Sequence, residues 1–366
     1  MLNLLSCISK NSEESYNWFF TPVFQYENAV KDQTVTQIYL IDENTGFLTG
    51  TDKMKVIEAG GNIKDQSAIF FRSTDGGKTF EKQILGKGYL EHISQSSDMT
   101  STYMVCARFS ESDIRTATNF EILKSCDFGQ TWELLYLFKN KMLDKVFFYN
   151  NMIGIASVIQ DPFGYDSPAL YKTTDGGKNW RITPVFMENK TLSLITSEGI
   201  IMGRYMDQRP EIWKMDINRL EIENILLEIP ESLVIFGTIQ EDPVTKFHYC
   251  KLRIRDENKI AGNPNEYFLY CVENKEMITL PSPAYYVYIY GDHISVWSRL
   301  KSNQFVAEYY YSQDKGRNWE NEILDNIIVS GAPGMYGEGY VWSMSSSWIN
   351  EVYCPLVVRI PPEKEK

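Results

Sequence analysis

Positive charge and histidine are both scarce in this sequence. Its 366 residues include 36 Lys and Arg against 48 Asp and Glu, which gives a formal net charge of -12 and a pI of about 4.9. A nucleic-acid binder would show a basic patch, and an anionic membrane surface would repel an acidic chain. The charge therefore argues against both classes, whereas it permits a basic protein partner.

The motifs of common catalytic and metal sites are also missing. Of the three histidines, His92, His248 and His293, only His248 has a cysteine close by, Cys250, and one such pair is too little for zinc. No glycine-rich phosphate loop opens a helix, and no nucleophile-elbow motif occurs. We expect no metal, no cofactor, and histidines that are ordinary strand or loop residues.

No run of 18 apolar residues exists, so the sequence predicts no transmembrane helix. The segment Leu4-Leu5-Ser6-Cys7 nevertheless resembles a bacterial lipobox, in which Cys7 would be lipidated, and residues 9–15 would be a polar tether. A signal peptide needs a basic region and a longer apolar stretch. Residues 1–15 are therefore either a signal-peptide remnant with its tether or a short hydrophobic N-terminus.

What the sequence does contain is many aromatic residues and an internal repeat. Tyr, Phe and Trp make up 14% of the chain, which favours strands. The pattern Ser/Thr-x-Asp-x-Gly-x-Thr/Asn-aromatic occurs four times. The four copies, here called boxes, are residues 73–80, 125–132, 173–180 and 312–319, and their aspartates are Asp75, Asp127, Asp175 and Asp314.

Each box predicts a tight β-turn. The Asp carboxylate can accept hydrogen bonds from nearby backbone N–H groups, and the Gly supplies a backbone conformation that other residues avoid. The aromatic residue would start the next strand and pack between neighbouring sheets. One carboxylate per turn is too few ligands for calcium, so the boxes are interpreted as structural.

The spacing of the boxes predicts a propeller. Asp75 and Asp127 are 52 residues apart, Asp127 and Asp175 are 48 apart, and Asp175 and Asp314 are 139 apart, or three steps of about 46. Two degenerate repeats would then lie between the last two boxes, with remnants at 214–218 and 272–275. The six units predicted are residues 34–86, 87–139, 140–187, 188–230, 231–282 and 283–324, each with four short β-rich runs.

The remaining residues, 325–362, carry three strand-like runs at 326–331, 339–344 and 351–360. The N-terminal run at 16–24 would supply a fourth, with Trp18 in the place of the box aromatic. We therefore predict an all-β, seven-bladed, monomeric propeller over residues 16–362, closed by its N-terminal strand and followed by a tail at 363–366. Closure would remove free sheet edges. A six-bladed ring with the tail packed elsewhere is the alternative.

The boxes resemble those of the Asp-box (BNR-repeat) β-propellers, a superfamily that includes sialidases, sortilin-type receptors and photosystem II assembly-factor-like proteins. The repeat sequences are most similar to those of the assembly-factor-like and sortilin-like groups, because an apolar strand, Asp and Gly at residues 38–48 precede the first box. This resemblance implies a sialidase-like fold and a non-catalytic scaffold. A shared fold does not fix a function, however.

A sialidase would need an Arg-Ile-Pro motif in its first blade, further arginines, a Tyr/Glu pair and an acidic proton donor. The only Arg-Ile-Pro, at 359–361, follows the last box. Four arginines in later blades could still form a carboxylate-binding cluster, although surface or loop roles are the alternative. They are Arg204, Arg253, Arg255 and Arg299.

Two cysteine pairs are predicted to lie across hairpins. They are Cys106 with Cys126 and Cys250 with Cys271, and each pair could form a disulfide, which would suit an oxidising compartment. A register slip of one residue would instead point the two thiols to opposite faces, and buried reduced thiols are the alternative.

Propellers bind ligands on the face opposite the boxes, where second strands join third strands and blade joins blade. The candidate loops are 160–166, 207–210, 255–259 and 345–348, with Phe163, Tyr165, Arg209, Arg255 and Trp348 as candidate binding residues. Three functions stay open. They are a non-catalytic scaffold for a protein partner in the bacterial envelope, including the periplasm and an outer-membrane lipoprotein; a sialidase-like or other glycoside hydrolase; and a carbohydrate-binding propeller.

Overall fold

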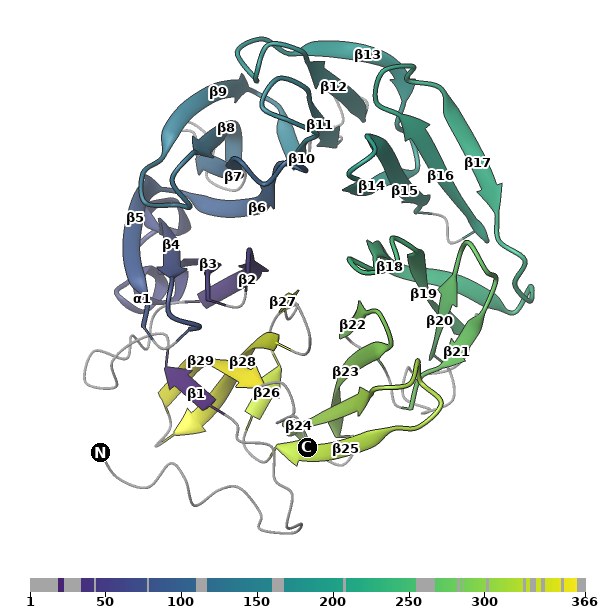
Figure 1. The fold of residues 1–366 in the computed structure, drawn as a ribbon. Helices are drawn as coiled ribbons and strands as arrows, with labels where there is room; N and C mark the ends of the chain where they lie inside the picture. Colours follow the sequence, from purple (N-terminus) through teal and green to yellow (C-terminus); the bar gives the residue numbers. More distant parts are fainter. Residues whose placement is uncertain are drawn as a thin grey trace. The chain divides into compact units, whose positions relative to one another are not determined.

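The protein is described from a computed structural model, over residues 19–22, 34–42, 44–77, 79–109, 117–159, 168–206, 209–254, 267–281, 284, 286–300, 303–324, 327–329, 334–336, 340–349 and 352–360. Almost all of its regular structure is antiparallel strand (Figure 1). Two compact units divide the chain. Residues 1–48, 71–82 and 242–366 form one, and residues 49–70 and 83–241 form the other.

Six four-stranded sheets follow one another along the sequence, here called blades 1 to 6, and each has its strands in sequence order. Blade 1 contains β2 (Thr34–Leu40), β3 (Gly46–Thr51), β4 (Ser67–Ser73) and β5 (Glu81–Lys87). Blade 2 contains β6 (Tyr89–Gln95), β7 (Thr102–Phe109), β8 (Ala117–Ser125) and β9 (Glu133–Lys139). Blade 3 contains β10 (Met142–Phe148), β11 (Gly154–Ile159), β12 (Ala169–Thr173) and β13 (Arg181–Phe186).

The second half of the chain continues the series. Blade 4 contains β14 (Lys190–Ile195), β15 (Ile200–Tyr205), β16 (Glu211–Asp216) and β17 (Ile222–Leu226). Blade 5 contains β18 (Leu233–Glu241), β19 (His248–Ile254), β20 (Tyr267–Cys271) and β21 (Met277–Thr279). Blade 6 contains β22 (Tyr286–Tyr290), β23 (His293–Leu300), β24 (Asn303–Ser312) and β25 (Glu320–Leu324). All six units predicted from the repeat are therefore confirmed as sheets.

A further sheet joins the two ends of the chain. Its order is β1 (Phe19–Pro22), β29 (Val352–Ile360), β28 (Tyr340–Ile349) and β26 (Ile327–Val329), with β27 (Gly334–Tyr336) also paired to β28. Phe19 lies opposite Arg359, so the predicted N-terminal strand does pair with the C-terminal one. Trp18 lies outside the described residues. The six four-stranded blades match the six-bladed alternative, and a seven-bladed ring stays a prediction.

The burial of the strands explains why the sequence folds this way. The second and third strands of a blade are apolar and covered, as in β7 and β4, whereas the fourth strand is more exposed, as in β5 and β9. Apolar side chains also connect successive blades. Tyr103 of blade 2 stacks on Phe148 of blade 3 with ring centroids 3.6 Å apart, inside one buried cluster. The hydrophobic core therefore lies between blades as well as within them.

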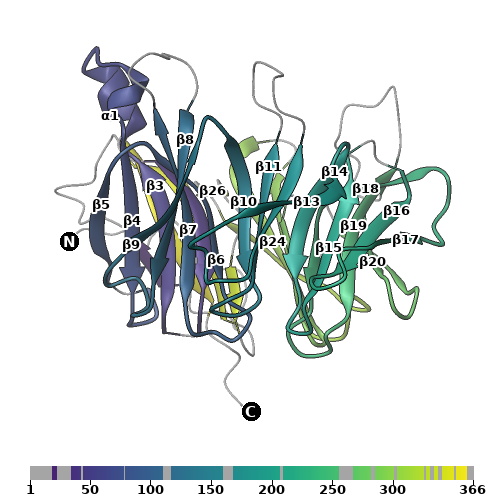
Figure 2. The ribbon, with the colours of Figure 1, turned by 90° about the horizontal axis from the view of Figure 1, so that it is seen from above.

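Short helices interrupt only one blade in the described part of the chain. Helix α1 (Lys53–Glu58) and the 3-10 turn η3 (Ile63–Asp65) lie between β3 and β4, and Figure 2 shows α1 at the end of the sheet where these two strands are joined. The hydroxyl of Thr51 donates to Gln66 Oε1 at 2.9 Å, which fastens this connection at both ends. None of the helices described here is long and apolar enough to cross a membrane.

The two predicted disulfides are wrong, because strand register separates the thiols. Cys106 lies opposite Glu121, while Cys126 lies beyond the end of β8 in the box turn. In blade 5, Cys250 lies opposite Tyr270 and Cys271 opposite Tyr249, a displacement of one residue that points the two thiols to opposite faces of the sheet. All four cysteines are free, and only Cys126 is exposed.

Candidate functional site

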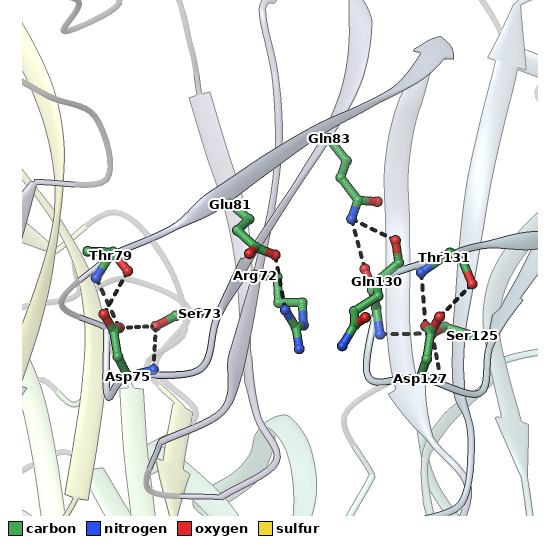
Figure 3. A network of polar contacts seen from close by, with 11 residues as sticks. Arg72, Ser73, Asp75, Thr79, Glu81, Gln83, Ser125, Asp127, Gln130 and Thr131 are labelled. Carbon is green, nitrogen blue, oxygen red and sulfur yellow. Dashed lines mark hydrogen bonds and ion pairs between the residues drawn. The ribbon is translucent and has the colours of Figure 1, made fainter.

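The four boxes all form the same hydrogen-bonded turn, between the third and fourth strands of blades 1, 2, 3 and 6. In the first box, Thr79 donates to Asp75 twice, from its backbone N–H to Oδ1 at 3.0 Å and from its hydroxyl to Oδ2 at 2.6 Å. The Ser73 hydroxyl donates to Asp75 Oδ1 at 2.8 Å and accepts from the Gly77 N–H at 2.9 Å. Figure 3 shows this arrangement, and its repetition around Asp127.

These turns fix their own charge state. Hydrogen bonds from Thr131 to the Asp127 carboxylate lower its pKa to about 2, and those from Asn179 do the same for Asp175. A backbone and a side-chain bond from Asn318 also lower the pKa of Asp314. Each carboxylate is satisfied inside its own turn, so the boxes act as structural staples, as their sequence predicted.

The box aromatics pack between sheets, also as predicted. Trp132 contacts Phe70 of blade 1 edge-on, with ring centroids 5.0 Å apart. Trp180 lies against Phe138 and Phe148, at 5.8 and 5.7 Å, and donates its indole N–H to the Gly177 carbonyl at 3.0 Å. A box therefore combines a tight turn with an aromatic residue that packs against the neighbouring blade.

Both degenerate repeats occupy the equivalent turns. Asp216, between β16 and β17, accepts from the backbone N–H groups of Asn218 and Arg219 at 2.8 and 3.0 Å. Asn274, between β20 and β21, accepts from the Glu276 N–H at 3.0 Å. The turn survives in blades 4 and 5, although the hydroxyl and the aromatic of the box have been lost.

Each blade has two ends that differ in character. The boxes mark one end, here called the box edge, and the first turn of a blade lies beside the box there, because the Gly176 N–H donates to the Met152 carbonyl at 2.9 Å. Since strands alternate in direction, the connection from second to third strand must lie at the opposite end, here called the loop edge.

The predicted binding residues divide between described and undescribed parts of the chain. Phe163, Tyr165 and Arg255 lie outside the described residues. Trp348 lies within β28, opposite Tyr353. Because β28 extends to Ile349, residues 345–348 are strand, and the prediction of a loop there is wrong. Arg209 does lie in the connection from β15 to β16, at the loop edge of blade 4.

Arg209 belongs to a cluster that the sequence did not reveal. Its guanidinium carbon lies 4.3 Å from the centroid of the Tyr205 ring, and Lys190 Nζ lies 5.3 Å from the same centroid. Tyr205 is the last residue of β15, only 6% exposed, and its hydroxyl donates to Asn224 Oδ1 at 2.7 Å. Two cations are thus held against one buried ring, a geometry that stabilises both.

Arg204 precedes Tyr205 on β15 and lies opposite Thr191, so its side chain leaves the other face of the sheet. Its Nη1 donates to the Tyr205 carbonyl at 3.2 Å, so the guanidinium turns towards the loop edge. Its Nε is buried and has no hydrogen-bond partner among the described residues. Burial lowers the pKa of Arg204. We call Lys190, Tyr205 and Arg209 the blade-4 cluster.

A second set of polar residues lies on the first strands of blades 2, 3 and 4, which are β6, β10 and β14. A β-bulge falls at Glu91 in β6, at Asp144 in β10 and at Ser193 in β14. Burial, and then the neighbouring Asp144 carboxylate, raises the pKa of Glu91. Lys145 is also covered, and its ammonium donates to the Leu192 carbonyl at 2.6 Å, which connects blade 3 to blade 4.

The histidines have structural partners. His92 accepts from the Val146 N–H at 3.4 Å, and burial, together with Lys145, lowers its pKa to about 3, so it is neutral. His248 Nδ1 lies 2.6 Å from Glu273 Oε1, and His293 Nδ1 lies 2.5 Å from the Tyr311 hydroxyl. Within the described ranges, no three His, Cys, Asp or Glu side chains are grouped so that they could hold a metal ion.

The arginines proposed for a carboxylate-binding cluster lie on different blades. Arg204 is on β15 and Arg253 is on β19, opposite Tyr267. Arg299 is on β23, opposite Ala307, and Arg359 of the Arg-Ile-Pro motif is on β29. Arg255 lies outside the described residues.

Comparison with known proteins places the fold. No protein-family model and no curated protein matches the sequence. Solved structures do match, among them YCF48 bound to D1 peptide, with 13% identity and a TM-score of 0.56 over 98% of both chains. The chain has a β-propeller fold. The propeller domain of the Trilobed protease from Pyrococcus furiosus matches with 10% identity and a TM-score of 0.56, over 91% of this propeller and 97% of that one.

Enzymes share the fold as well. An oligogalacturonate lyase from Vibrio parahaemolyticus matches with 9% identity and a TM-score of 0.56, over 95% of this propeller and 98% of the lyase. At such identities the likeness concerns the fold alone. It confirms the predicted β-propeller fold, and function has to be argued from sites.

Proposed function

We propose that this propeller is a non-catalytic scaffold that binds a protein segment at the loop edge of its blades. The observation that carries the proposal is the likeness to YCF48 bound to D1 peptide, a propeller that matches over 98% of both chains and holds a peptide. The loop edge of blade 4 supports it, because a buried Tyr with an Arg beside it is the kind of pair that dominates protein interfaces.

The proposed location is the bacterial envelope. Its support is the lipobox-like segment that ends at Cys7, which lies outside the described residues. The cysteines lend no further support, since Cys106, Cys126, Cys250 and Cys271 are free. The partner could carry any charge, because a net charge of -12 describes the whole chain and not the surface that makes contact.

An affinity pull-down from the envelope fraction of the native cell, with the full chain as bait, tests the proposal. We expect one stoichiometric partner, lost when Tyr165 or Trp348 is changed to Ala. Phe128→Ala is the matched control, because Phe128 is an aromatic residue 48% exposed at the box edge. If no protein is enriched, or if Phe128→Ala abolishes binding as completely as Trp348→Ala, the proposal is wrong.

A glycoside hydrolase is the second candidate, favoured by one feature. Glu91 is a carboxyl of raised pKa beside the Asp144 carboxylate, and glycosidases use a carboxyl pair of this kind. The test is turnover of a fluorogenic sialoside and of aryl glycosides by the full chain. Turnover abolished by Glu91→Gln would establish the enzyme, and no turnover with any of these substrates would remove it.

A further inference from the structure

We propose that two copies of this chain associate through β9, the last strand of blade 2, so that the two β9 strands pair antiparallel and join two blades into one sheet. This inference is independent of the proposed function, which concerns the loop edge of the blades. It replaces the monomer predicted from the sequence. Three observations carry it: the open edge of β9, its apolar composition compared with the other fourth strands, and the placement of its two charges.

The strand β9 lies at one end of its sheet, and Figure 1 shows it at the rim of blade 2, away from β6. Among the described strands it pairs with β8 alone, so the backbone N–H and C=O groups along its other side have none of these strands beside them. Such an edge is a template on which another extended strand can add. The contact is therefore made by the backbone, and it requires a partner in an extended conformation.

The fourth strands of the other blades carry features that prevent pairing between edges. Pro184 interrupts β13, and Gly86 lies between charged and apolar residues in β5. Glu223 lies within β17, β25 contains two Glu, and β21 is only three residues long. Of the six fourth strands, only β9 has five consecutive apolar residues, Leu134–Phe138, with no Pro, Gly or charge among them. An apolar edge of this kind favours association.

One protective feature does occur in β9, a bulge at Leu135. The pairing with β8 shifts between Leu134 and Tyr136, so Leu135 is the additional residue. A Cβ at Gly177 would lie 2.5 Å from Leu135 Cδ2, which shows that this side chain packs against the box of blade 3. The bulge therefore serves the packing between blades. Regular pairing continues beyond it from Tyr136 to Lys139, and Leu134 is still 58% exposed.

The two charges of β9 identify the partner strand as a second copy of β9. Glu133 begins the strand and Lys139 ends it, and both residues are exposed. When two copies pair antiparallel about a two-fold axis at Tyr136, Glu133 of each copy lies opposite Lys139 of the other, with the apolar residues between them. A parallel pairing in register would place Glu133 against Glu133 instead. The strand is therefore complementary to itself in the antiparallel direction.

The test is analytical ultracentrifugation of the full chain at concentrations up to about 1 mM. Salt is held at about 0.15 M, where the repulsion between two chains of net charge -12 is screened beyond about 8 Å. A seven-residue strand makes a small interface, so we expect a reversible rise from 42.4 kDa towards twice that mass. Glu133→Lys and Lys139→Glu should each weaken the dimer about tenfold, because each places like charges opposite one another at both ends of the paired strands. The double variant Glu133→Lys/Lys139→Glu should restore it.

Arg181→Glu is the matched control, because Arg181 is the exposed first residue of β13, the corresponding strand of blade 3, and it should leave the dimer unchanged. Hydrogen exchange gives a second readout, since the amides of residues 133–139 should gain protection as the concentration rises. The mass of a single chain at every concentration would overturn the inference. So would a dimer that both single variants leave intact, that the double variant fails to restore, or that Arg181→Glu weakens equally.

Discussion

The hydroxyl of Ser125 donates a 2.8 Å hydrogen bond to Oδ1 of Asp127. The same contact recurs in every box, between Ser73 and Asp75, Thr173 and Asp175, and Ser312 and Asp314, at 2.8, 2.8 and 2.9 Å. In each case the hydroxyl also accepts from the N–H of the box Gly. One small side chain therefore connects the carboxylate to the backbone of the turn, which explains why the first position of the box is Ser or Thr.

Removing this hydroxyl should destabilise the fold. Ser125 is only 2% exposed, so Ser125→Ala leaves the buried Gly129 N–H without its acceptor and should lower the free energy of unfolding by about 1–3 kcal/mol. Urea unfolding measures the effect as a lower midpoint with an unchanged slope. Ser197→Ala, at an exposed residue of the same unit, is the control. A Ser125→Ala midpoint equal to that of the parent would show that water replaces the hydroxyl.

The box carboxylates should make stability depend on acid pH. Asp127 and Asp175 have pKa values of about 2 in the folded chain, below the ordinary value of 3.8, so the unfolded chain binds more protons. Their contribution is then fully present above about pH 4 and is lost as pH falls towards 2. Melting temperatures between pH 5 and pH 2 should therefore fall, and less steeply in Asp127→Asn. A melting temperature that stays constant over this range would contradict the prediction.

Sequence reasoning predicted the turns better than the registers. The hydrogen bonds of a box can be predicted from its sequence, since Asp, Gly and the Ser or Thr lie within five residues. The spacing of the four boxes, with two degenerate repeats between the third and the fourth, located every four-stranded blade. Strand register, in contrast, depends on packing between residues that are far apart in the sequence. Nothing local to Cys250 and Cys271 shows that they are displaced by one residue, and nothing around Glu91 or Asp144 marks a bulge.

The blade-4 cluster shows the same limit. Arg209 was predicted from its loop, but Tyr205 and Lys190 were missed because their partnership depends on the pairing of β14 with β15. The available signal was a Tyr at the end of a second strand with an Arg four residues later, across the loop edge. Phe163, Tyr165 and Arg255 lie outside the described residues, so their predicted roles stay predictions.

Free cysteines should react according to their burial. Burial raises the pKa of Cys106 and of Cys250 to about 12, so almost no thiolate forms at pH 8, whereas Cys126 is exposed. A short pulse of iodoacetamide followed by peptide mass spectrometry should label Cys126 and spare the other two until urea is added. A reductant should leave the unfolding midpoint unchanged. A disulfide-linked pair of peptides containing Cys106 and Cys126 would contradict the assigned register.

A methyl group at Gly203 should disturb both the fold and the blade-4 cluster. A Cβ there would lie 2.1 Å from the Thr191 carbonyl oxygen and 2.3 Å from the Trp213 ring, which is fully buried. Neither backbone nor ring can withdraw, so β14 and β15 must separate, and Gly203→Ala should cost about 1–3 kcal/mol in the free energy of unfolding.

The same substitution should also loosen the packing of Tyr205, because Gly203 and Tyr205 lie two residues apart on one face of β15. Urea unfolding should therefore give Gly203→Ala a lower midpoint than the parent chain. Gly60→Ala is the control, since its Cβ would meet no atom within 4 Å and only its φ of +75° is strained. A Gly203→Ala midpoint no lower than that of Gly60→Ala would mean that the pairing of β14 with β15 accommodates the added methyl group.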